Sequence, residues 1–109
     1  MKTYSAQSGY VSRYFYEGRR PLRSGAEYVF SVSADSARWR PARVLLGAAA
    51  IAAWQSRHAR ELSSTECYAI AKMALFQAFD ERPAPARMTG AVLVREADVE
   101  AIAATLDFL

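Results

Sequence analysis

The chain has 109 residues, of which 52% are hydrophobic and 23% charged, with a formal net charge of +3 at pH 7. This composition supplies enough apolar side chains for one core and excludes a disordered or low-complexity chain. The single cysteine, Cys67, excludes an internal disulfide and a thiolate metal cluster, which favours a reducing, cytoplasmic location.

The N-terminal segment has a lysine, Lys2, but no apolar run behind it, which argues against a cleavable secretory signal. The longest uncharged apolar run, residues 44–54, is shorter than the roughly 20 residues of a membrane span. We therefore expect no membrane association. Abundant alanine and the preference for arginine over lysine are typical of high-GC bacterial genes, an association without a structural cause.

Two runs in the first third of the chain predict strands. Residues 10–17, "YVSRYFYE", are rich in the aromatic and β-branched types that favour a pleated surface. Residues 27–33, "EYVFSVS", alternate large apolar with mostly polar side chains, which is typical of a strand with one buried face. The segment between the runs predicts a long, mobile hairpin connection, because it contains the turn formers Gly18, Pro21, Ser24 and Gly25.

A third strand is predicted over residues 39–46, "WRPARVLL", after a short turn at residues 34–38. It should return antiparallel and so complete a meander. Pro41 cannot donate a ladder hydrogen bond, which predicts that this strand lies at a sheet edge or is broken at the proline.

From Gly47 the pattern changes to helical spacing, and the first helix should run towards Glu61. Ser63 and Glu66 form a capping box, which predicts the start of a second helix. That helix should be the central one, because it carries a broad apolar face made of Cys67, Ile70, Ala71, Ala74, Leu75, Ala78 and Phe79.

Pro83 and Pro85 should end the second helix and form a stiff linker, and "AVLV", residues 91–94, is compatible with a short fourth strand. A last helix should begin at "READ", residues 95–98, and its core stripe is Val99, Ile102, Ala103 and Leu106. The predicted fold is one α+β domain over residues 1–109, in which an antiparallel three- to four-stranded meander packs against three helices. Residues 1–46 should be mainly β and residues 47–109 mainly α.

The sequence contains no phosphate loop, zinc-ligand spacing or nucleophile elbow, so we predict no catalytic residue, no cofactor and no metal. His58 and Glu61 could share a helix face as an acid–base pair, but a solvated charge pattern is the commoner explanation. Cys67 is interpreted as a small core residue rather than a nucleophile. Asp80 and Glu81 are interpreted as a solvated helix end.

Charge is distributed unevenly along the chain. Residues 1–43 hold eight Lys or Arg against three acidic residues, a net of +5, whereas residues 44–109 hold six against eight, a net of −2. A basic sheet region indicates an anionic partner, because clustered positive charge concentrates phosphates.

The stretch "GYVSRYFYEGRRPLRSG", residues 9–25, interleaves tyrosines with arginines. One strand face could stack unpaired bases while arginines in the hairpin loop hold phosphates. We therefore predict a small non-enzymatic binding or regulatory domain that contacts nucleic acid or another polyanion. The alternatives are a homodimer or other protein-interaction domain that pairs through a sheet edge, and a small enzyme that uses His58 or Cys67. The predicted contact residues are Arg13, Tyr14, Tyr16, Arg19, Arg20, Arg23, Arg38 and Arg40.

Overall fold

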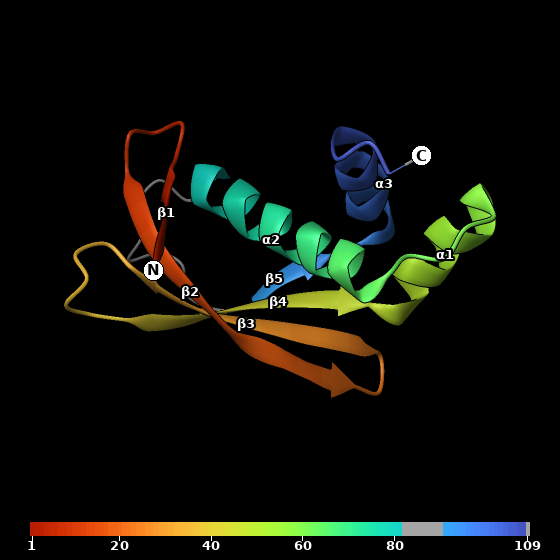
Figure 1. Cartoon of the computed structure of the whole chain (residues 1–109), viewed down its shortest axis with the longest axis horizontal. Coiled ribbons are helices and arrows are strands. Elements are labelled where there is room, and N and C mark those ends of the chain that lie inside the picture. Colours follow the sequence, from red (N-terminus) through yellow and green to blue (C-terminus); the bar gives the residue numbers. More distant parts are fainter. Residues whose placement is uncertain (82–90, 109) are drawn as a thin grey trace.

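The sheet of this protein has five strands in the order β1-β2-β3-β4-β5 in the computed structural model, which describes residues 1–81 and 91–108 (Figure 1). The first four strands are antiparallel neighbours, and β5 is parallel to β4. The strands are β1 (Lys2–Ser5), β2 (Val11–Leu22), β3 (Gly25–Ser33), β4 (Arg40–Gly47) and β5 (Ala91–Val94).

The predicted α+β class is confirmed, but the purely antiparallel meander of three or four strands is wrong in two respects. The short N-terminal strand β1 was not expected, and it pairs with the start of β2. The strand at residues 91–94 exists but is parallel to β4, because the chain crosses over between them through two helices instead of a hairpin.

The predicted long hairpin connection is also wrong. Strand β2 continues to Leu22, only Arg23 and Ser24 form the turn, and β3 begins at Gly25. The β2–β3 register shifts between Tyr16 and Gly18, so Glu17 is the extra residue of a β-bulge. The glycine at position 18 therefore supports a bulge within the strand, where the sequence predicted a loop.

Pro41 does not place β4 at the sheet edge, since β4 lies between β3 and β5. The proline is tolerated because β5 pairs only with Arg43–Leu46 and does not reach it. Pro41 therefore interrupts no pairing with β5, but the strand that contains it is not an edge strand.

Three helices of the described residues lie on one face of the sheet (Figure 1). They are α1 (Ala48–His58), α2 (Ser64–Glu81) and α3 (Glu96–Thr105). The predicted capping box is confirmed, because the Glu66 amide donates to Ser63 Oγ and the Ser63 amide donates to the Glu66 carboxylate, at 3.1 and 3.0 Å. The proposed linker at Pro83 and Pro85 lies outside the described residues.

The core forms between the helices and the alternating apolar side chains of β3 and β4. Phe30 and Val44 are completely buried, as are Ile70 and Leu75 of α2. The predicted apolar face of α2 is confirmed from Ile70 to Phe79, whereas Cys67 at its start is only half-buried.

Asp80 is not the solvated helix end that we expected. Its carboxylate accepts hydrogen bonds from the Tyr4 hydroxyl at 2.8 Å and from the Gln7 amide at 3.0 Å. The end of α2 therefore holds the N-terminal strand β1, which is the strand that the sequence did not predict.

Candidate nucleic-acid interface

One face of β2 packs against the helices and the other does not. The predicted contact residues are therefore divided between two sides of the sheet. Tyr14 points to the helix-covered side, where it is 4% exposed and its ring centroid lies 5.5 Å from that of Phe76. A ring in this position cannot stack on a base, so the assignment of Tyr14 to the contact surface is wrong.

Tyr16 also lies on the helix-covered side, at its rim. Its ring is 42% exposed and packs against Tyr68 of α2 at a centroid distance of 4.7 Å. The bulge after Tyr16 then places Arg19 opposite Tyr28, on the same side of the sheet. Arg19 and Arg20 are therefore strand residues on opposite faces and not neighbours in a loop, which corrects the predicted arrangement.

The opposite side of the sheet, which no described element covers, carries an aromatic pair made of the exposed Phe15 and the partly buried Trp39. We call this side the uncovered face, and it includes Arg13 and Phe15 of β2, Val29 of β3, Arg43 of β4 and Leu93 of β5. Phe15 is 42% exposed, and its ring centroid lies 5.0 Å from that of Trp39. Trp39 is held in place because its Nε1 donates to the Ser36 carbonyl at 3.1 Å.

The loop that carries Trp39 is organised by Asp35. Its carboxylate accepts hydrogen bonds from the amides of Ala37 and Arg38 at 2.8 and 3.0 Å. The amides of Arg38 and Ala37 hold the pKa of Asp35 below its ordinary value, because they stabilise the charged form. The loop is also tied to β2, since Arg13 Nη1 donates to the Ala34 carbonyl at 2.6 Å.

Three arginines lie on the uncovered face or directly next to Trp39. Arg13 lies beside Phe15 on β2, Arg38 precedes Trp39, and Arg43 is exposed on β4. Among the described residues, none of these three arginines forms an ion pair. Arg20 is on the same face, but its charge is compensated by Glu27, whose carboxylate lies 3.0 Å from the guanidinium.

Two arginines of the predicted contact surface, Arg23 and Arg40, do not lie with the arginines of the uncovered face. Arg23 is in the turn at the opposite end of the β2–β3 hairpin. Arg40 pairs in register with the buried Val32, so it belongs to the helix-covered side. Of the predicted contact residues, Arg13 and Arg20 lie on the uncovered face and Arg38 lies next to Trp39, whereas Phe15, Trp39 and Arg43 were not among those predicted. The signal was present, because strand alternation places Phe15 opposite Tyr14 and so on the side away from the core.

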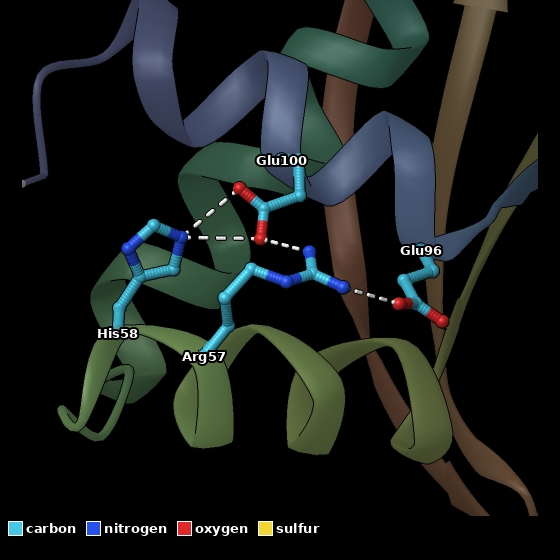
Figure 2. Close-up of polar contacts among 4 residues, drawn as sticks. All are labelled: Arg57, His58, Glu96 and Glu100. Atoms are coloured by element: carbon cyan, nitrogen blue, oxygen red, sulfur yellow. Dashed lines mark hydrogen bonds and ion pairs between the residues drawn. The ribbon is translucent and has the colours of Figure 1, made fainter.

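His58 and Cys67, the residues of the enzyme alternative, do not meet. His58 Nε2 lies 3.0 Å from Glu100 Oε2 on α3, and Arg57 Nη2 lies 2.7 Å from Glu96 Oε1 (Figure 2). Arg57 also pairs with Glu100. The alternative in which His58 and Glu61 share a helix face does not apply, because α1 ends at His58 and Ala59 takes a left-handed conformation, with φ of 50°. This cluster joins α1 to α3.

Burial raises the pKa of the Cys67 thiol, which does not favour a nucleophilic thiolate at neutral pH. Within residues 1–81 and 91–108, no group of three His, Cys, Asp or Glu side chains could hold a metal ion. In the same part of the chain, no helix combines the length and apolar character that a membrane crossing requires.

Comparison with known proteins finds no matching family model, no similar curated protein and no similar solved structure. The function is therefore argued from the residues of this chain.

Proposed function

We propose that this protein is a non-enzymatic binding domain whose uncovered face binds single-stranded nucleic acid. The observation that carries the proposal is the Phe15–Trp39 pair, which leaves aromatic surface exposed on a side of the sheet that no described element covers. Bases stack on exposed aromatic rings without regard to sequence, and each stacked base contributes about 1–3 kcal/mol.

The charges of the same face favour a polyanion. Arg13 and Arg43 lie on this face and Arg38 directly precedes Trp39, so their guanidinium groups can contact the phosphates of a bound strand. A symmetric dimer through this face would bring equivalent arginines of two copies close together, which is unfavourable. A homodimer is therefore the second candidate, and an exposed sheet edge is the better place for it.

The test is a titration of short fluorescein-labelled RNA and DNA single strands at several salt concentrations, followed by anisotropy. We expect affinity to fall with salt with a log–log slope of about −0.7 for each neutralised phosphate. Arg43→Gln should reduce the magnitude of this slope by about 0.7. Phe15→Ala should weaken binding by about 1–3 kcal/mol and leave the slope nearly unchanged.

A charge-matched control is Lys72→Gln, which removes one positive charge from α2 on the other side of the sheet. It should leave the salt slope unchanged. Absence of binding at low salt, or equal effects of Arg43→Gln and Lys72→Gln, would contradict the proposal. Sedimentation equilibrium of the same samples tests the second candidate, since a stable dimer that excludes the oligonucleotide would favour it.

A further inference from the structure

The turn of the β2–β3 hairpin, the start of α1 and the start of α2 lie close together (Figure 1). Residues of these elements and of β4 line a pocket. Its volume is about 270 Å³. Ligand pockets usually measure roughly 300–1,000 Å³, so this one would suit a small molecule. It is on the helix-covered side of the sheet and is therefore separate from the uncovered face.

The floor and one wall of the pocket are apolar. Ala26 and Leu46 are buried at its base, and Ile51 contributes from α1. Arg19 and Ala52 are exposed at its rim, which opens the pocket to solvent. An apolar base with a polar rim is the usual composition of a small-molecule site.

Polar groups of three elements converge on this space. Arg19 of β2 lies beside the hydroxyl of Tyr28 and near the thiol of Cys67. Tyr28 is only 2% exposed, so its hydroxyl has little access to bulk water. The side-chain oxygen of Gln55, Oε1, accepts a hydrogen bond from the Leu62 amide at 2.9 Å. The side-chain nitrogen of Gln55 is therefore the group that can donate to a ligand in the pocket.

The Arg19 guanidinium lacks a carboxylate partner among the described residues. Glu66, which lies near Cys67, accepts a hydrogen bond from the Ser63 amide and forms an ion pair with Arg60. A positive charge at the rim of an apolar pocket, without a protein counter-ion, favours an anionic ligand.

The backbone around the pocket is held by contacts within the protein and needs no ligand to form. The Ala48 amide donates to the Ser24 carbonyl at 2.8 Å, which joins the first turn of α1 to the hairpin turn. Gly25 has a φ of 150°, and a Cβ at this position would lie 2.2 Å from the Leu46 carbonyl oxygen. Only glycine allows the hairpin to approach the junction of β4 and α1 this closely.

We propose that this pocket binds a small organic carboxylate, with its apolar body against Ala26, Leu46 and Ile51 and its carboxylate on Arg19. The planar guanidinium matches a carboxylate in shape and charge. A doubly charged phosphate ester fits less well, because Arg19 is the only cation that lines the described pocket.

The test is a titration of the ¹⁵N-labelled protein with benzoate and, separately, with its uncharged analogue benzamide, followed by amide resonances. Benzoate should shift the resonances of Gly25, Ala48 and Ala52 and should bind at least about tenfold more tightly than benzamide. Arg19→Gln should weaken benzoate at least about tenfold and leave benzamide unchanged. Equal binding of the two probes, or shifts centred elsewhere, would overturn the proposal.

Two further variants separate the pocket from general charge effects. Arg23→Gln removes the same charge from the neighbouring turn, outside the pocket lining, and should change benzoate affinity less than about twofold. Ala52→Leu keeps a strong helix former at an exposed position of α1 and should block both probes by filling the pocket. Unchanged benzoate binding by Ala52→Leu, or equal losses in Arg19→Gln and Arg23→Gln, would exclude this site. None of these outcomes depends on nucleic-acid binding.

Discussion

The two faces of the sheet carry similar aromatic residues in different surroundings. On the helix-covered side, Phe30 of β3 is completely buried, and its ring contacts Tyr14, Tyr16 and Tyr68. On the uncovered face, Phe15 of β2 is 42% exposed and contacts Trp39. Aromatic character therefore does not say whether a side chain stabilises the fold or contacts a partner. The elements that cover a face decide this, and the exposed ring of Phe15 is the basis of the proposed binding surface.

The sharpest test of this difference is a pair of matched substitutions. Phe30→Ala should lower the free energy of unfolding by about 3–5 kcal/mol, because it removes a buried ring and leaves a cavity. Phe15→Ala should lower it by less than about 1 kcal/mol, since much of that ring is already in water. Urea denaturation followed by far-UV circular dichroism measures both values. Equal losses would mean that the uncovered face is buried in solution by another copy or another segment.

Sequence reasoning predicted the helix-covered side better than the uncovered face. The alternation of β3 and the helical spacing of α2 both follow from burial, so Phe30, Ile70 and Phe79 were expected in the core and are found there. Strand β1 could not be predicted in this way. It is four residues long, and a contact distant in sequence, from Tyr4 to Asp80, helps to hold it.

The candidate site was harder to predict because it depends on which face remains open. Alternation separates Tyr14 from Phe15 but does not say which of them meets the helices. The bulge at Glu17 reverses the alternation after Tyr16, so Arg19 points to the pocket side and Arg20 does not. A bulge depends on pairing with the next strand, which a single sequence does not reveal.

Two glycines of the β2–β3 hairpin provide the second test, because one lies against α1 and the other lies in open space. Gly25→Ala should cost about 2–4 kcal/mol, since the new Cβ would meet the Leu46 carbonyl oxygen in addition to the backbone strain. Gly18→Ala should cost about 1 kcal/mol, because its φ of 154° is strained for alanine but nothing lies within 4 Å. Thermal unfolding distinguishes the two variants. If Gly18→Ala costs as much as Gly25→Ala, the close approach of the hairpin to α1 is not what requires glycine at position 25.

The smallest effect is expected in the helical layer, where ion pairs on the surface link α1 to α3. The hydrogen bond from His58, together with Arg57, holds the pKa of Glu100 below its ordinary value. A lowered pKa stabilises the folded state above the unfolded value, about 4.3, and this stabilisation is lost as the pH falls through the folded pKa. Glu100→Gln should therefore lower the unfolding temperature slightly at pH 7, and the difference from the wild type should shrink below about pH 4.

Glu61→Gln removes the same charge from an exposed residue outside the described ion pairs and serves as the control. A difference for Glu100→Gln that persists unchanged to low pH would show that the contact between α1 and α3 depends on packing instead of on this carboxylate.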